Sequence, residues 1–398
     1  DLTVEVGLCV GRDLAGDGRR PGCEAAAQHT TMEATAERWR ERLHKVTVDG
    51  GTPEAHALRD ALRTAHAHLL LSADGAWLRP GTRSYARSWI RDGAMMSAGL
   101  LRLGETQAPR AYLKAWAGIQ YESGKVPCCH DARGADPVPE HDSAGEFLFL
   151  AAQVLEYGGE AGRRDVAAVW PQLKKAVAYL DALRAQTQGP GQPPEYAGLL
   201  PVSISHEGYS AKPMHSLWDN FWALRGYADA ISIADALHHP EEAAAFAAAR
   251  REYRAAVQAA LARSMQTHGI GFLPGAADLG DFDPTSTTIA LSPGTGGDDV
   301  PRDALKATFD KYWTFFTDRR DGRLAWDNYT PYEWRNVGAL VRLHERERAI
   351  AAFEWFFAAR RPLPWNQWTE VVTRDAVTPR FLGDLPHGWV ASDFLRAA

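Results

Sequence analysis

Residues 88–104, SWIRDGAMMSAGLLRLG, carry the pattern on which the fold prediction depends. A polar loop with aromatic residues leads into an apolar helix over 91–104, and Gly104 stands where that helix is expected to end. Arg91 and Asp92 lie at the helix start, where an aspartate also serves as a cap. The same order of polar loop and apolar helix recurs along the chain.

Twelve helices are predicted from residue 53 onward, and Pro, Gly and capping signals mark many of their ends. Long loops with Trp, Tyr, His, Asp and Glu precede every second helix, whereas short turns precede most of the others. The predicted ranges are 53–72, 91–104, 108–120, 143–157, 160–186, 215–236, 240–264, 285–292, 301–317, 331–344, 346–360 and 388–397.

Six helix pairs with their polar loops on one side indicate a closed ring of six inner and six outer helices. The predicted fold is therefore all-α, an (α/α)6 barrel. A solenoid would contain a similar number of helices, but it would show a clearer sequence repeat at a fixed period, which we do not find.

Residues 1–50 form a separate unit, and residues 51–398 form the predicted barrel domain. Residues 2–10, LTVEVGLCV, alternate like a strand, and a short helix is expected from Met32. This partly β segment is either the tail of a β-domain or an N-terminal extension. Cys9 and Cys23 are close enough to close a loop, whereas the adjacent Cys128 and Cys129 are not expected to bridge each other.

Composition excludes several classes of protein. A net charge of −6 and a pI near 6.2 argue against binding to nucleic acid or an anionic membrane. The sequence has no apolar run of about 18 residues and no signal-peptide pattern at its start, so we expect a soluble chain without membrane insertion. No P-loop, dinucleotide fingerprint or zinc spacing is present, so no cofactor or metal is expected. A periplasmic or secreted location is favoured only slightly, and the oligomeric state stays open.

Aromatic residues are more informative than the overall charge. The chain has 14 Trp, 12 Tyr and 14 Phe, and many stand beside polar residues in the predicted loops. Flat apolar rings next to hydrogen-bonding groups suit a sugar ring. Glycosidic cleavage needs two carboxylic groups that flank the bond, and several loops supply acidic residues to the same rim. The sequence therefore predicts sugar chemistry.

Two glutamates in these loops are the candidate acid and base. Glu207 follows His206, and Glu370 stands among Trp and amide side chains that can hold a carboxylate and tune its pKa. A simpler interpretation makes Glu207 a solvated loop residue and Asp219 a buried polar partner of its neighbours. The residues expected to bind substrate lie at or near the rim, and they are Trp89, Arg91, Asp92, His141, Asp142, Tyr209, His215, Trp218, Glu333, Trp365, Trp368, His387 and Trp389.

The chain resembles the glucoamylase-like superfamily of (α/α)6-barrel glycosidases, which includes glucoamylases, trehalases and the glucosidase region of glycogen-debranching enzymes. Residues 88–104 are similar to the segment that opens the second helix of that family, which implies that Arg91 and Asp92 bind the non-reducing-end sugar. Residues 140–157, EHDSAGEFLFLAAQVLEY, resemble the segment that opens the fourth helix and place Asp142 at the rim.

The same resemblance implies roles for the acidic residues. Glu207 lies eight residues before His215-Ser216, in the place of the glucoamylase general acid, and Glu370 lies 17 residues before His387, in the place of the base. In trehalase-like relatives the acid is an aspartate in a Trp-Asp segment, so Asp219 is the alternative acid.

The expected function is that of an inverting, exo-acting glycoside hydrolase with an oligosaccharide or polysaccharide substrate. Glu207 would protonate the glycosidic oxygen and Glu370 would deprotonate water, which requires the carboxyl groups to lie about 6.5–9.5 Å apart. Two alternatives stay open: a phosphorylase or epimerase on the same scaffold, and a non-catalytic carbohydrate-binding module.

Overall fold

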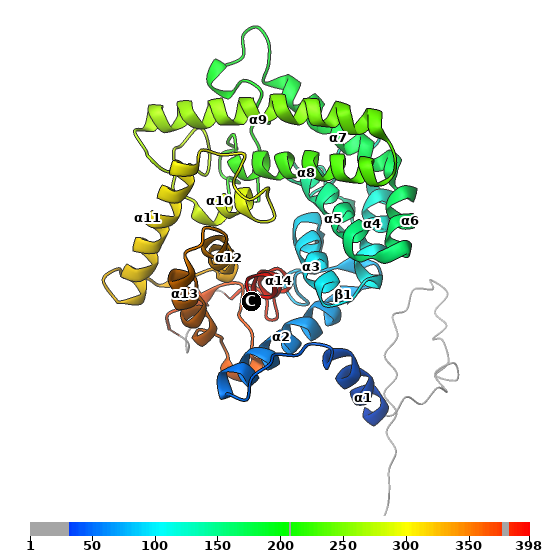
Figure 1. The fold of residues 1–398 in the computed structure, drawn as a ribbon, viewed down its shortest axis with the longest axis vertical. Helices are drawn as coiled ribbons and strands as arrows, with labels where there is room; N and C mark the ends of the chain where they lie inside the picture. Colours follow the sequence, from blue (N-terminus) through cyan, green and yellow to red (C-terminus); the bar gives the residue numbers. More distant parts are fainter. Residues whose placement is uncertain (1–31, 207, 376–381) are drawn as a thin grey trace, which may run out of the picture.

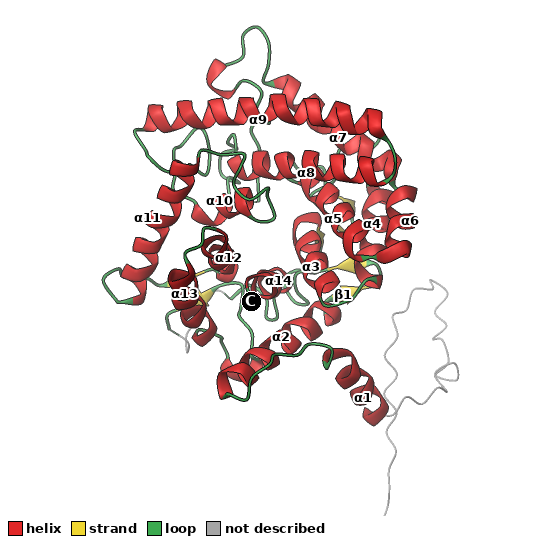
Figure 2. Ribbon diagram, viewed as in Figure 1, coloured by secondary structure: helices red, strands yellow, loops and turns green. Residues whose placement is uncertain are grey.

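The computed structural model describes residues 32–206, 208–375 and 382–398. These residues are mostly helical, with a few short strands between the helices (Figure 2). The sequence prediction of an all-α fold is confirmed at this level. The strand-like stretch at residues 2–10, together with Cys9 and Cys23, lies outside the described residues.

Six helices follow the long polar loops, and each of them packs against the next. Named so that each helix contacts the next, they are α3 (Ile90–Arg102), α5 (Ser143–Tyr157), α8 (Leu217–Ala236), α10 (Pro284–Leu291), α12 (Trp334–Arg342) and α14 (Gly388–Ala397). Because α14 also packs against α3, the sequence of neighbours closes on itself.

The remaining helices lie outside these six, as Figure 1 shows for α9 over α8 and for α13 beside α12. They are α2 (Pro53–Leu71), α4 (Gln107–Ile119), α6 (Gly159–Ala168), α7 (Trp170–Gln186), α9 (Pro240–His268), α11 (Arg302–Arg320) and α13 (Arg346–Ala358). A further helix, α1 (Met32–Leu43), packs against α2.

Short elements occupy the loops. The 3-10 helices are η2 (Pro194–Tyr196), η3 (Pro331–Glu333) and η4 (Leu363–Trp365). Three small antiparallel sheets pair β1 with β2, β3 with β4 and β4 with β5, and β6 with β7. The strands are β1 (Ala73–Asp74), β2 (Trp77–Leu78), β3 (Ser88–Trp89), β4 (Cys129–Asp131), β5 (Gly134–Ala135), β6 (Asn328–Tyr329) and β7 (Val372–Thr373).

Most predicted helices are found within a few residues of their predicted bounds, but two predictions need correction. The helix predicted over 160–186 is divided into α6 and α7, because Pro171 lacks the backbone N–H that a continuous helix would use and instead stands in the first turn of α7. The helix predicted over 331–344 begins as the 3-10 helix η3. The sequence also offers Ser286 as the cap of the helix predicted over 285–292, but the cap of α10 is Asp283, whose side chain accepts from the backbone N–H of Ser286.

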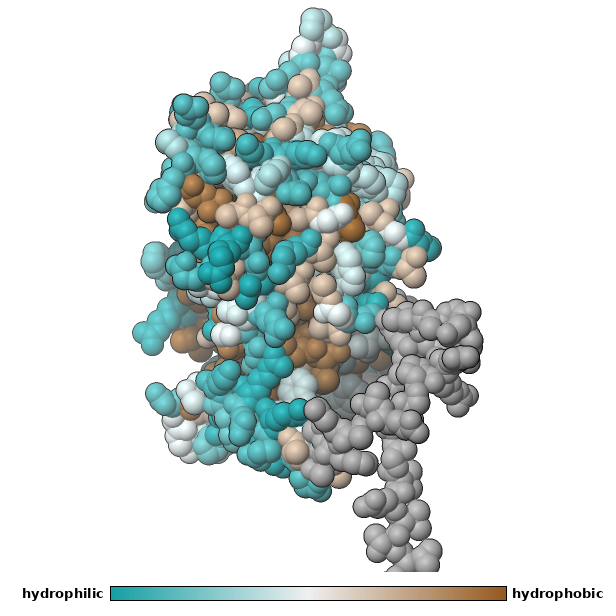
Figure 3. All heavy atoms as spheres, turned by 90° about the vertical axis from the view of Figure 1, so that its right-hand side faces the viewer, coloured by the Kyte–Doolittle hydropathy of each residue, from teal (hydrophilic) through white to brown (hydrophobic). Residues whose placement is uncertain are grey.

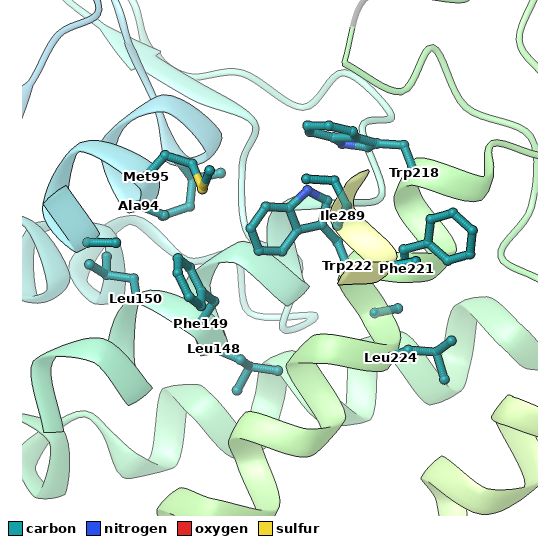
Figure 4. Packing of buried hydrophobic residues seen from close by; sticks show 14 of the residues in the cluster. Ala94, Met95, Leu148, Phe149, Leu150, Trp218, Phe221, Trp222, Leu224 and Ile289 are labelled. Carbon is teal, nitrogen blue, oxygen red and sulfur yellow. The ribbon is translucent and has the colours of Figure 1, made fainter. Parts of the chain in front are cut away.

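Burial separates the inner helices from the outer ones. In α3 every residue from Ile90 to Leu101 is buried, whereas α9 buries only one face of its length. Figure 4 shows how the inner helices meet: Met95 of α3, Phe149 of α5 and Trp222 of α8 lie close together, and the last two rings are 5.5 Å apart. Because both sides of an inner helix are covered, polar side chains are left exposed mainly at its ends.

One side of the outer surface is largely polar. Figure 3 shows mostly hydrophilic residues on the side to the right of Figure 1, with apolar residues in smaller groups between them. Among the helices that the structure describes, none has both the length and the apolar character required to cross a membrane.

The contact between α5 and α8 depends on glycine, and this leads to a stability prediction. A Cβ on Gly145 would lie 2.2 Å from the backbone oxygen of Trp222, so Gly145→Ala must push the two helices apart. Such overpacking costs about 1–3 kcal/mol, which exceeds the gain of up to ~1 kcal/mol in helix propensity. We expect a lower free energy of unfolding, measured by chemical denaturation. Gly118→Ala in α4 is the control because no atom lies within 4 Å of its added Cβ, and it should be neutral or stabilising. Equal stability of Gly145→Ala and the wild type would contradict this packing.

Candidate active site

A cavity of about 280 Å³ lies where α3, α10, α12 and α14 begin. Its wall combines four Trp and Tyr rings with three carboxylates and two guanidinium groups. The long loops end at these helix starts, so residues far apart in the sequence meet there. Six of the residues predicted for the site line the cavity, and they are Trp89, Arg91, Asp92, Glu370, His387 and Trp389.

Glu370 is held on the cavity wall by two tyrosine hydroxyls. Tyr85 donates to Oε2 over 2.6 Å, and Tyr332 donates to Oε1 over 3.1 Å. Burial and the nearby charges of Glu370 and Asp92 raise the pKa of Tyr332, so its hydroxyl keeps the proton that it donates. Two tyrosine hydroxyls therefore hold the carboxylate of Glu370 in place on the cavity wall.

The imidazole of His387 also faces Glu370, with Nε2 3.9 Å from Oε1. Burial lowers the pKa of His387 to about 3, so this ring is neutral near pH 7 and adds no positive charge beside the carboxylate. Its Nδ1 accepts from the backbone N–H of Val390 and thereby caps α14. His387 thus caps the start of α14 and also lies beside the carboxylate of Glu370.

Gly383 allows the loop to pass beside Glu370. It has a φ of 63°, and a Cβ at this position would overlap the Glu370 carboxylate. A side chain at position 383 would therefore displace the carboxylate from its two tyrosine partners.

Arg91 is fixed by carboxylates on neighbouring loops. Its Nη1 lies 2.5 Å from Glu140 and 3.5 Å from Asp142, and its Nε lies 3.7 Å from Asp92. The indole N–H of Trp218 donates to Asp142 over 2.8 Å. Arg91 and Asp92 reach the cavity wall, whereas Asp142 lies behind it and holds Arg91 and Trp218 in place.

The guanidinium group of Arg335, a second cation on the cavity wall, lies among aromatic rings. Its guanidinium carbon is 5.2 Å from the Trp218 ring, 5.3 Å from Tyr332 and 5.0 Å from Trp389. Its Nη1 pairs with the buried Asp393 at 3.3 Å. This arrangement immobilises a cationic donor and two apolar ring faces on the wall of the cavity.

Asp219 is buried next to the site but does not line the cavity. The hydroxyls of Ser203 and Ser205 donate to its two oxygens over 2.5 and 3.0 Å. Burial, followed by the negative charge of Asp142, raises its pKa well above the usual value for aspartate. The surroundings of Asp219 therefore favour its protonated form.

His206 connects the Asp219 region to the cavity. Its Nδ1 lies 3.0 Å from Ser205 Oγ, its ring lies 4.6 Å from the Trp218 ring, and burial lowers its pKa to about 3. The ring lines the cavity. Glu207, the next residue in the sequence, lies outside the described residues.

Several residues that were predicted to bind substrate do not line the cavity. Trp368 is buried in the core, where its indole N–H donates to the Phe356 carbonyl over 2.8 Å. Glu333 forms a two-point ion pair with Arg319 at 2.7 and 2.8 Å and accepts from Tyr312. Neither lines the cavity, and their contacts are those of core residues.

Four more predicted residues lie away from the cavity wall. His215 pairs with Asp278 at 2.9 Å, and Tyr209 donates to Asp281 over 3.1 Å. His141 is buried in the loop before α5, and Trp365 is half exposed in η4. Their aromatic or polar character in a loop was not enough to determine which way each side chain points.

The cavity also contains residues that the sequence prediction did not single out. The most important are Tyr85 and Tyr332, because they hold Glu370. Both stand in the polar loops that precede inner helices, which is the one signal that could have identified them. The full set consists of Pro80, Tyr85, His206, Asp283, Thr285, Thr330, Tyr332 and Arg335.

Comparison with known proteins places the fold among glycosidases. No protein-family model and no curated protein matches the sequence. Among solved structures, a rhamnosidase from Klebsiella oxytoca with rhamnose bound has a TM-score of 0.62 at 15% identity, over 88% of this chain and 64% of that one. The chain thus spans about two thirds of the rhamnosidase.

Two shorter structures match over nearly their whole length. A glycosidase has a TM-score of 0.62 at 15% identity, over 88% of this chain and 98% of that one. The GH63 mannosylglycerate hydrolase from Thermus thermophilus, in complex with Tris, has a TM-score of 0.54 at 13% identity, over 84% of this chain and 99% of that one. At these identities the comparison shows a shared fold.

Proposed function

We propose that the chain is a glycoside hydrolase in which Glu370 is the general base. The observation that carries this proposal is the setting of Glu370, a carboxylate held by two neutral hydroxyls on the wall of a cavity lined with aromatic rings. Such a carboxylate can take a proton from water while the hydroxide attacks the anomeric carbon. The rings and the fixed guanidinium groups suit the faces and hydroxyls of a sugar.

The closed sequence of six inner helices supports an (α/α)6 barrel of the glucoamylase-like type. The sugar-binding roles proposed for Arg91 and Asp92 agree with their position on the cavity wall. The glycosidase that matches over 98% of its length has also been solved as a variant in complex with glucose. We infer that this chain acts on a neutral sugar residue, since burial lowers the pKa of both histidines that line its cavity, and Arg91 and Arg335 on its wall already pair with carboxylates.

We propose Glu207 as the general acid, with Asp219 as the alternative. Glu207 follows His206, whose ring lines the cavity, and it has the spacing to His215-Ser216 that the resemblance implies. The raised pKa of Asp219 favours the protonated form that an acid needs, but its carboxyl group is buried behind the wall and accepts from two serines. Because the Asp219 carboxyl group does not line the cavity, the position of Glu207 next to His206 in the sequence favours Glu207.

The size of the cavity supports exo action. About 280 Å³ lies just below the range of roughly 300–1,000 Å³ for ordinary small-molecule sites, so the cavity suits a terminal sugar residue more than a long stretch of polysaccharide. Inversion is proposed because Glu370, as a base, deprotonates a water molecule and does not itself attack the anomeric carbon.

The stereochemical course gives a direct test of this proposal. A panel of aryl-glycosides and oligosaccharides should identify one sugar that the protein releases, and proton NMR during the first minutes should show the anomer opposite to that of the substrate. Inversion is expected because a water molecule must enter between Glu370 and the sugar. Release of the retained anomer would rule out Glu370 as a base. Product formation that depends on phosphate would identify a phosphorylase, and no turnover across the panel would favour a binding module.

A further inference from the structure

An adjacent pair of cysteines, Cys128 and Cys129, lies directly behind the cavity wall. Both are 1% exposed, both carry free thiols, and their Sγ atoms lie 2.7 Å apart. Together with Trp89 they form a small apolar cluster, against which Tyr85 and Val138 pack. The two cysteines therefore pack in the same cluster as Trp89 and Tyr85, which line the cavity.

A metal ion is not the best partner for these sulfurs. Within the described residues, the two Sγ atoms and an oxygen of Asp136 lie within 4.8 Å of one another, which is a possible ligand set. However, Nη1 of Arg87 already lies 3.1 Å from Cys129 Sγ and 3.0 Å from Asp136 Oδ2. A metal cation would have to displace a guanidinium that contacts both ligands, so the geometry favours chemistry between the sulfurs themselves.

The two thiols differ in their surroundings. Arg87 donates to Cys129 Sγ over 3.1 Å, whereas no guanidinium contact is seen at Cys128 among the described residues. The hydrogen bond to Cys129, followed by burial, raises the pKa of Cys128, so this thiol keeps its proton. Cys129 is thus suited to attack an oxidant first, and Cys128 is suited to resolve the product.

A disulfide between adjacent residues would be easily reversed. Neighbouring Cα atoms lie about 3.8 Å apart across a trans peptide, whereas disulfides usually join Cα atoms that are about 4.4–6.8 Å apart. The bond would therefore be strained, and strained disulfides are the more reducible and regulatory ones. Such a pair suits a redox couple better than a permanent crosslink.

The pair is connected to the site through the backbone as well as through packing. Cys129 of β4 is the direct partner of Trp89 in β3, and the backbone N–H of Ile90 donates to the Cys128 carbonyl over 3.0 Å. Tyr85, on the same cluster, donates to Glu370 over 2.6 Å. A disulfide would close a covalent ring through the Cys128–Cys129 peptide. Its formation would therefore move backbone atoms that set the position of Trp89 and Tyr85.

We propose that Cys128 and Cys129 form a redox modification site at which a peroxide produces a disulfide that alters the adjacent cavity wall. The Cys129 thiolate attacks one peroxide oxygen, the O–O bond breaks, and the leaving hydroxide takes up a proton to become water. The Cys128 sulfur then attacks the resulting sulfenic acid, the S–O bond breaks, and water leaves with the Cys128 proton. The sulfurs are oxidised, the peroxide is reduced, and the sum is one disulfide and two waters. Burial of both thiols limits access to a small oxidant such as hydrogen peroxide.

Peptide mapping of the full chain tests the modification directly and does not depend on any activity. After treatment with hydrogen peroxide, alkylation and trypsin digestion, the fragment over residues 126–133 should carry no alkyl group. Its mass should be lower than that of the reduced fragment by two hydrogens. Dithiothreitol should restore two alkylated cysteines. Full alkylation after peroxide, or oxidation to sulfinic acid without loss of the two hydrogens, would overturn the proposal.

The coupling to the cavity has two readouts. Hydrogen exchange of residues 85–90 should differ between the oxidised and reduced forms, and this holds whether or not the chain hydrolyses sugars. The effect on turnover rests on the proposed function: kcat/KM should fall by about tenfold or more on oxidation, because small displacements of positioning groups are costly. Unchanged exchange would overturn the coupling, whereas a difference in exchange without any turnover would count against the hydrolase alone.

Two sets of variants control for the other thiols. Cys128→Ser and Cys129→Ser should each abolish the reversible response to peroxide, while the double variant Cys9→Ser/Cys23→Ser should keep it. A response that persists in Cys128→Ser would assign the effect to another residue. If a variant at 128 or 129 does not fold, the peptide map of the wild-type chain still decides the question.

Discussion

Glu370→Gln is expected to lower kcat by a factor on the order of 10²–10⁴, the usual contribution of a general base. Glutamine keeps the shape of the side chain and can still accept from one tyrosine hydroxyl, but it cannot take a proton from water. The two tyrosine hydroxyls can reorient toward the amide oxygen, so the substitution keeps hydrogen bonding in this part of the wall. Steady-state kinetics on the sugar identified in the panel measures the effect.

The control for this variant is Glu347→Gln, which removes one carboxylate from the exposed surface of α13. It should match the wild type in kcat and in melting temperature. Glu370→Gln should also match the wild type in melting temperature, because its hydroxyl partners can reorient. Near-normal turnover by Glu370→Gln would refute the base role, whereas a collapse of the melting temperature would show that Glu370 acts mainly in structure.

The second large effect concerns the proton donor. Glu207→Gln should lower kcat by a factor on the order of 10²–10⁴ for substrates with a poor leaving group. The loss should be far smaller for a dinitrophenyl glycoside, because that leaving group departs without a proton. This dependence on the leaving group is the signature of a missing acid and distinguishes it from a missing base.

Asp219→Asn is the matched variant. The pKa of Asp219 is raised by burial, and its oxygens accept from Ser203 and Ser205, so the amide should cost less than about tenfold in kcat, with little dependence on the leaving group. Kinetics with both substrates for both variants decide the assignment. If Asp219→Asn shows the steep dependence on the leaving group and Glu207→Gln does not, Asp219 is the acid.

Much of the helical framework could be predicted because its signals are local. The helix over 143–157 and the helix over 388–397 have the bounds that apolar pattern, Gly158 and the polar loops indicate. The division at Pro171 was missed because the apolar pattern continues across it. Side-chain caps also depend on geometry, and for this reason Asp283 caps α10 although Ser286 has the residue type of a cap.

The candidate site was only partly predictable. Arg91, Asp92 and His387 lie on the cavity wall because each stands at the start of an inner helix, a position that the sequence pattern marks. Trp368 and Glu333 stand in similar loops, yet their side chains enter the core between helices. Residue type is the same in both situations, so it does not separate a ring that faces sugar from one that packs against protein.

The sequence alone determined the approximate bounds of most helices and that polar loops precede every second one, because capping, proline and apolar periodicity act over a few neighbouring residues. Only the tertiary structure decided that Tyr85 holds Glu370 from 285 residues away and that Arg335 lies among rings from α8, η3 and α14. Burial, charge and hydrogen bonding at each loop side chain depend on what the other loops bring against it. These contacts arise only when the inner helices close on one another.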